Sequence, residues 1–146
     1  MNLLQIGDKE VKLGNRVVSK QLISEFATLT GDKNLLHVND SYAKSGGFEQ
    51  TIAHGMLTVS LIIGLMYESG LFDDVETIFS ELKLVKFIKP VYPETIISAT
   101  VKIKETYASK SNNGTYVIVN IDGFEQESVN LFVKCEAKFK IISEVK

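Results

Sequence analysis

One apolar run of helical length, residues 55–70 (GMLTVSLIIGLMYESG), constrains the fold more than any other part of the chain. A helix on a protein surface has polar residues every three or four positions, which together form a polar face. This segment has almost no such residues. The run is also too short and too interrupted to span a bilayer. We therefore predict a helix that the rest of the protein encloses.

The second half of the chain has the alternation expected of strands that could enclose such a helix. Apolar residues occupy every second position in three segments, 95–107, 115–121 and 129–142. Period two over these lengths is typical of antiparallel strands with one buried and one exposed face. In the last segment, the residues predicted to face the core are Val129, Leu131, Val133, Cys135, Ala137, Phe139 and Ile141.

Turn and bulge signals separate and shape these strands. Asn112–Gly114 is typical of a hairpin turn. A fourth strand within residues 81–90 changes register near Leu84 and Val85, which indicates a β-bulge. A fifth, short strand is expected near the N-terminus.

Helical signals fill the front half of the chain. Ser19 is a suitable N-cap for a helix that ends at Gly31, and a short helix from residue 40 should stop at Gly46 and Gly47. One enclosed helix followed by four long antiparallel strands predicts an α+β fold, a hot-dog domain spanning residues 1–146. Such a domain leaves sheet edges and one side of the helix uncovered, so we expect it to form a homodimer.

Composition limits the classes of binding partner and the cellular compartment that we expect for this chain. The formal net charge of −2 leaves no broad cationic surface for nucleic acid. The single cysteine, Cys135, excludes an internal disulfide, and its place in the strand pattern predicts a small buried side chain. The N-terminus becomes charged too early for a signal peptide. We expect a soluble, cytoplasmic protein with no membrane partner.

Both histidines of the chain lie between Thr30 and Gly55, in a segment rich in turn-forming residues. Asp32 and His37 are five residues apart in the sequence. A carboxylate and an imidazole that lie close together can jointly hold and deprotonate a water. Gly55 falls in the first turn of the enclosed helix, where a backbone N–H can bind a carbonyl oxygen that gains negative charge. These groups suffice to add water to a double bond conjugated with a thioester, or to remove it.

Each of these residues also fits a purely structural role. Asp32 and Asn34 can form the local hydrogen bonds of an ordinary turn, which is the better interpretation from spacing alone. His37 can be a hydrogen-bonded loop histidine, and we interpret His54 as a structural residue that orients the loop entering the helix. Two histidines and a carboxylate can bind iron or zinc, but their spacing here is not that of a compact ligand motif.

The stretch FATLTGDKNLLHVNDSYAKSGGFEQTIAHGML, residues 26–57, closely resembles the MaoC-like (R)-specific enoyl-CoA hydratases and 3-hydroxyacyl dehydratases. Their motif runs as F-A-x-x-[ST]-G-D-x-N-P-[IL]-H-x-[DN], followed by H-G-M. The later FIKPVYPETI resembles the strand that follows in the family. Order and spacing match from Val17 to about Ile142, which favours the catalytic interpretation over the ordinary turn.

The resemblance implies reversible hydration of trans-2-enoyl thioesters to (3R)-3-hydroxyacyl thioesters. Asp32 and His37 match the catalytic pair that would hold the attacking water, and Gly55 matches the glycine whose N–H binds the thioester carbonyl. Asn34 and His54 match supporting positions in the motif. The resemblance implies no metal, and no cofactor beyond the coenzyme A or phosphopantetheine of the substrate. The pantetheine arm would run along the dimer interface, with acyl carrier protein as a candidate partner.

Three residues depart from the family pattern without removing a reacting group. Leu35 stands where the motif has proline, Asn39 where an acid is common, and Pro93 where glycine is usual. Two other functions use the same features. One is a non-catalytic subunit that binds acyl thioesters. The other is an acyl-CoA thioesterase, which commonly needs a carboxylate on the central helix, and positions 55–67 offer none.

Overall fold

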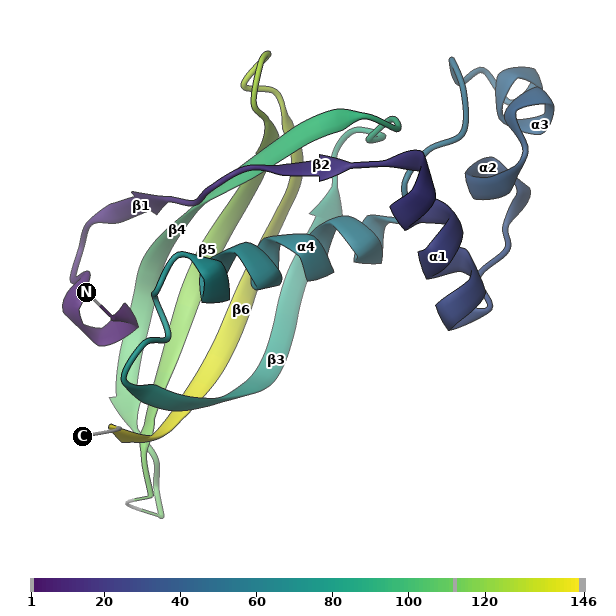
Figure 1. Cartoon of the computed structure of the whole chain (residues 1–146). Coiled ribbons are helices and arrows are strands. Elements are labelled where there is room, and N and C mark those ends of the chain that lie inside the picture. Colours follow the sequence, from purple (N-terminus) through teal and green to yellow (C-terminus); the bar gives the residue numbers. More distant parts are fainter. Residues whose placement is uncertain (1, 112, 145–146) are drawn as a thin grey trace.

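A computed structural model describes residues 2–111 and 113–144 of the chain. Within these residues, six strands form one antiparallel sheet that curves around a long helix (Figure 1). The elements are η1 (Leu3–Gln5), β1 (Glu10–Lys12), β2 (Arg16–Val18), α1 (Lys20–Thr30), α2 (Leu35–Val38), α3 (Asp40–Ser45), α4 (Gly55–Glu68), β3 (Val75–Phe87), β4 (Thr95–Ala108), β5 (Thr115–Glu125) and β6 (Leu131–Glu144). The strand order is β1-β4-β5-β6-β3, with β2 also paired to β4. This is the predicted hot-dog arrangement.

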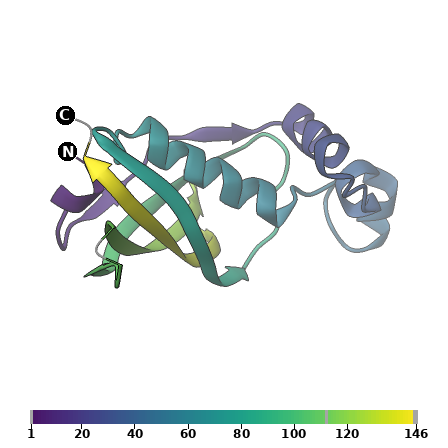
Figure 2. The same cartoon turned by 90° about the horizontal axis from the view of Figure 1, so that it is seen from below.

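The helix α4 occupies the predicted position and lies across the concave face of the sheet (Figures 1 and 2). Its buried apolar residues are Leu57, Val59, Ile62, Leu65 and Met66. They join a core to which the strands contribute Val101, Val119, Ile121, Ala137 and Phe139, among others. Burial of one such aliphatic side chain is worth about 1.5–3 kcal/mol, so helix and sheet stabilise each other.

One side of α4 stays uncovered, as the sequence predicts. Met56 and Tyr67 are 48% and 47% exposed, and Ser60 between them is exposed as well. The three residues follow helical spacing and form one uncovered stripe along α4. No helix in residues 2–111 and 113–144 is long and apolar enough to cross a membrane.

The alternation is confirmed in β5 and most of β6. In β4 it fails at Ser98, which is buried and donates a hydrogen bond to Leu13 O (3.0 Å). Cys135 is buried as predicted, and burial raises the pKa of its thiol to about 11. The prediction for Val129 and Leu131 was wrong: Val129 lies in a turn at φ 56° and is 69% exposed, and Leu131 is half-buried. Phe132 is buried instead, because the pairing of β5 with β6 shifts register between Gly123 and Phe124.

The bulge predicted in the fourth strand is confirmed in β3. Its pairing with β6 shifts register between Lys83 and Lys86, and Leu84 takes a positive φ of 52°. Two short strands, β1 and β2, stand where one was expected. Of the predicted hairpin turn, Asn112 lies outside the described residues, and the flanking strands pair up to Ala108 and Thr115.

The three helices α1, α2 and α3 gather beyond the N-terminal end of α4 (Figures 1 and 2). As predicted, the Ser19 side chain caps α1 by accepting a hydrogen bond from Leu22 N (3.1 Å), and α3 ends before Gly46 and Gly47. The short helix α2 was not predicted. The segment that joins α1 to α4 thus contains both short helices, α2 and α3.

The close packing of the sheet against α4 at Gly123 gives a stability prediction. A Cβ at Gly123 would lie 2.6 Å from Val133 Cγ1 and 2.8 Å from Ile62 Cδ1. We expect Gly123→Ala to lower the free energy of unfolding by about 1–3 kcal/mol, since the added methyl group overpacks the core. Urea denaturation followed by circular dichroism measures the change.

The matched control is Gly14→Ala, where the added methyl group meets no atom within 4 Å. We expect it to change stability by less than about 0.5 kcal/mol. Equal stability of the two variants would contradict the close packing at Gly123.

Candidate active site

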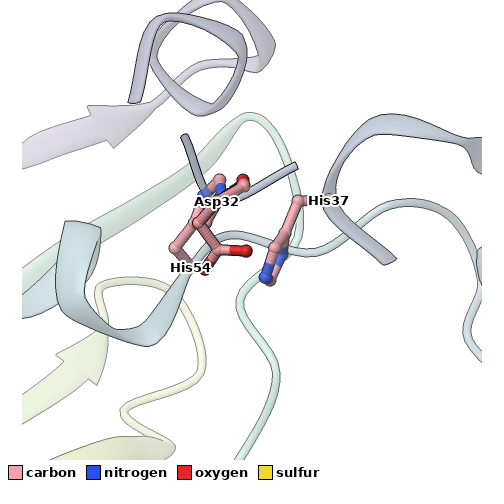
Figure 3. A group of neighbouring side chains, drawn as sticks. All are labelled: Asp32, His37 and His54. Carbon is pink, nitrogen blue, oxygen red and sulfur yellow. Dashed lines mark hydrogen bonds between the residues drawn. The ribbon is translucent and has the colours of Figure 1, made fainter. Parts of the chain in front are cut away.

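Asp32, His37 and His54 converge beside the start of α4 (Figure 3). Asp32 follows α1, His37 belongs to α2, and His54 directly precedes α4. One nitrogen or carboxylate oxygen from each residue lies within 4.8 Å of the corresponding atoms of the other two. The predicted pair, Asp32 and His37, is therefore close enough to share a bridging water.

The hydrogen bonding of His37 fixes which of its nitrogens can take a proton. Its Nδ1 lies 2.8 Å from the carbonyl oxygen of Ile52. Because a carbonyl oxygen can only accept, Nδ1 carries the hydrogen, and Nε2 of the neutral ring keeps a lone pair. His37 is half-buried. It can therefore act as a base through Nε2 while Ile52 holds its ring.

His54 connects the two members of the pair. Its Nε2 donates to the backbone oxygen of Asp32 (2.9 Å), and its ring stacks on that of His37 with centroids 3.8 Å apart. His54 is 2% exposed, and burial lowers its pKa, so the ring is neutral near pH 7. No described residue forms a hydrogen bond to its Nδ1. This geometry agrees with a supporting role, which stays a prediction.

The turn that carries Asp32 contains the local hydrogen bonds of an ordinary turn. Asp32 Oδ1 accepts from Asn34 N (3.3 Å), and Asn34 Oδ1 accepts from Leu36 N (3.0 Å) and so caps α2. The structural interpretation of Asp32 and Asn34 and the catalytic one are therefore compatible. The turn fixes the backbone of Asp32, whose exposed side chain lies beside His37.

The three departures from the family motif fall at element boundaries. Leu35 is the first residue of α2, and the Asn39 side chain caps α3 by accepting from Tyr42 N (2.9 Å). An asparagine caps a helix about as well as an aspartate. Pro93 is buried in the turn before β4.

Asp40 is a site-supporting residue that the sequence reasoning missed. Its carboxylate accepts from Thr51 N (2.9 Å) and from Lys20 Nζ (2.9 Å). These hydrogen bonds, that from Thr51 above all, lower the pKa of Asp40 to about 2. Asp40 thus ties α3 to α1 and to the segment entering α4. Its position next to Asn39, at the start of a helix, is the only signal of this role in the sequence.

A cavity of about 430 Å³ opens beside these residues. Four phenylalanines, Phe26, Phe48, Phe87 and Phe132, line it together with Asp32, His37, His54 and Gly55. Its volume falls in the usual range for small-molecule sites. The N–H of Gly55 has no carbonyl to bond within its own helix, because the first N–H groups of a helix never do. The cavity therefore joins an apolar wall to a polar end.

The hydroxyls on the first two turns of α4 bond back to the helix. Thr58 Oγ1 donates to Gly55 O (2.6 Å), and Ser60 Oγ donates to Met56 O (2.8 Å). Such bonds satisfy the hydroxyls locally. The hydrogens of these two hydroxyls are therefore already used within α4, whereas Asp32, His37 and the N–H of Gly55 can bond to a molecule in the cavity.

The cluster also has the donor types of a two-histidine, one-carboxylate metal site. The bonds to Ile52 and to Asp32 leave one nitrogen on each ring, and that of His54 is buried. The structure thus brings together ligands that the sequence spacing did not suggest. That no metal is used stays a prediction.

Comparisons with known proteins agree with the sequence resemblance. A family model described as "MaoC like domain" matches residues 4–122. The chain is 29% identical over 115 residues to the uncharacterized protein YdeM of Bacillus subtilis, covering 79% of this chain and 80% of that protein. It is 37% identical over 113 residues to the probable enoyl-CoA hydratase 2 of Dictyostelium discoideum, covering 69% of this chain and 37% of that protein.

A solved structure shows the same architecture. The (R)-hydratase from A. caviae involved in PHA biosynthesis superposes with a TM-score of 0.75 at 25% identity, covering 92% of this chain and 95% of that one. The similarity therefore extends over the fold as well as over the motif.

The start of α2 gives a second stability prediction. The N–H of Leu35 has no intrahelical partner, and Asn34, at φ −52° and ψ 131°, has a conformation that a following proline allows. We expect Leu35→Pro to raise the free energy of unfolding by about 0.4–1 kcal/mol, because proline restricts the unfolded chain. Urea denaturation measures the change.

Leu36→Pro is the control, since it removes the N–H that donates to Asn34 Oδ1. We expect this variant to be destabilised. A Leu35→Pro variant as unstable as Leu36→Pro would show that the loop does not have the described conformation.

Proposed function

The chain belongs to the MaoC-like domain family, and from this we propose that it catalyses reversible hydration of trans-2-enoyl thioesters to (3R)-3-hydroxyacyl thioesters. The carrier of the acyl group is coenzyme A or the phosphopantetheine of acyl carrier protein. The observation that supports this proposal most is the convergence of Asp32, His37 and the start of α4 on one apolar cavity. The similarity to an (R)-hydratase and to a probable enoyl-CoA hydratase points to the same reaction.

In the proposed mechanism, His37 and Asp32 hold one water. His37 takes a proton through Nε2, since its Nδ1 is bound to Ile52, and Asp32 orients the water by accepting its second hydrogen. The water oxygen bonds to C3, and the electrons of the C2–C3 double bond move toward C2 and the thioester oxygen. Return of the proton from the pair to C2 completes the addition.

The start of α4 stabilises the charge that develops in this reaction. The N–H of Gly55 donates to the thioester oxygen, and the helix dipole favours negative charge at the same place. One donor of this kind is worth about 10²–10³ in rate. The proposed reaction needs no metal and no redox cofactor, because the only steps are a proton transfer and the addition of water.

Hydration of crotonyl-CoA, followed by loss of its conjugated absorbance, tests the proposal. We expect Asp32→Asn and His37→Ala each to lower kcat/KM at least about 100-fold, since each removes a group that handles the water. Asp8→Asn, an exposed carboxylate that does not line the cavity, is the matched control and should retain full activity. Circular dichroism checks that every variant is folded.

Two outcomes would contradict the proposal in different ways. Binding of crotonyl-CoA without turnover in either direction would indicate a non-catalytic acyl-thioester subunit. Release of free thiol without hydration would indicate an acyl-CoA thioesterase. Against the thioesterase, the acidic residue of α4 is Glu68 at the far end of the helix, where it pairs with Arg16.

The active form in this proposal is a homodimer. A second copy would cover the uncovered stripe of α4 (Met56, Ser60 and Tyr67), and the pantetheine arm would run along the interface toward Lys89, which lines the cavity. Sedimentation equilibrium at assay concentrations should give twice the mass of 16.2 kDa. A fully active monomer would contradict this part of the proposal.

A further inference from the structure

The aromatic ring of Phe87 lies directly against Gly55. A Cβ added to Gly55 would be 2.6 Å from Phe87 Cε1 and Cζ, which is far closer than two carbon atoms approach without a bond. The ring therefore fills the space that a side chain at position 55 would take. Phe87 also lines the cavity, and it is 52% exposed, so its ring stands at the rim between the cavity and the solvent.

Backbone contacts on both sides of Phe87 hold the ring in this place. Phe87 pairs with Val133 after the bulge of β3, and the N–H of Ile88 donates to Phe132 O (2.8 Å). Four residues after Phe87, the carbonyl of Val91 accepts from Ala53 N (2.8 Å). The segment that carries the ring is thus fastened to β6 and to the approach to α4.

We propose that Phe87 is a specificity-determining residue that excludes acyl groups carrying a substituent on C2, the carbon next to the thioester carbonyl. This inference rests on the proposed function, in which the N–H of Gly55 binds the thioester oxygen. A hydrogen bond of about 2.9 Å to this N–H holds C1 and C2 within a few ångströms of Gly55. The ring of Phe87 already occupies the space beside the glycine, so a methyl group on C2 meets the ring.

Unbranched acyl groups leave the ring of Phe87 in place beside Gly55. An acyl group with a branch on C2 has to displace the ring, and it thereby loses the contact between the ring and the acyl chain.

Binding of two saturated thioesters, butyryl-CoA and isobutyryl-CoA, tests the proposal without turnover. They have equal numbers of carbon atoms, and isobutyryl-CoA carries a methyl branch on C2. We expect calorimetry to show that the protein binds butyryl-CoA about 10-fold or more tightly than isobutyryl-CoA, the range seen when one methyl group is rejected by a pocket. In Phe87→Ala the preference should fall to within about 3-fold.

Phe79→Ala is the matched control. Phe79 lies on the same strand and is 44% exposed, but its ring stacks on Phe139 and does not line the cavity. This variant should keep the preference of the parent protein. Phe87→Leu provides a second test if Phe87→Ala fails to fold, since a smaller, non-planar side chain should also weaken the preference. An unchanged preference in the folded Phe87 variant would overturn the proposal.

Turnover separates this inference from the proposed function. If crotonyl-CoA is hydrated and its 2-methyl derivative is not, Phe87→Ala should raise the relative rate of the 2-methyl substrate about 10-fold or more. If nothing is hydrated but the binding preference depends on Phe87, the hydratase proposal fails and the role of Phe87 stands. If wild-type protein binds neither saturated thioester, the role of Phe87 is overturned too.

Discussion

The rest of the structure depends on the burial of α4. A helix with almost no polar face is stable only when other elements remove it from water, and here a curved sheet does so along most of its length. The sheet comes so close to the helix at Gly123 that a single methyl group there would meet Ile62. The register shifts in the pairings of β3 with β6 and of β5 with β6 help the sheet to curve around the helix, since bulges increase the twist and bending of a strand.

The five residues that lead into this helix hold the candidate site together. Each of these residues, 51–55, contacts a different residue elsewhere in the chain. Thr51 N bonds to Asp40, Ile52 O to His37, Ala53 N to Val91 and His54 to Asp32, while Gly55 packs on Phe87. A short segment anchored by the buried helix therefore positions Asp32, His37 and the ring of Phe87 at once. Such an arrangement suits chemistry that needs fixed dipoles, because little reorganisation is left for the reaction itself.

The sequence predicted the parts of the fold that follow from periodicity. The enclosed helix, the alternation of β5 and most of β6 and the bulge at Leu84 were all predicted from the spacing of apolar residues. The same rule failed at Val129 and Leu131, because alternation says nothing about where a turn ends and a strand begins. The motif indicated Asp32, His37 and Gly55 as site residues. Their proximity, however, depends on tertiary contacts.

Other features could not be predicted from the sequence because they arise between distant segments. The stacking of His54 on His37 joins residues 17 positions apart, and the contact of Phe87 with Gly55 joins a strand end to a helix start. Asp40 bonds to Thr51 and to Lys20, which are 11 and 20 positions away along the chain. No local pattern reports such pairs. They follow from how the sheet and the helices pack.

The link between the site and the interior has a consequence for local stability. Many binding sites lie on loops that open far more easily than the protein as a whole unfolds. Here the residues that hold Asp32 and His37 lead directly into the first turn of a helix whose other turns belong to the core. Opening of the site is therefore expected to fray the first turn of α4. Substitutions that loosen the core are thus expected to change the site even when they lie far from it.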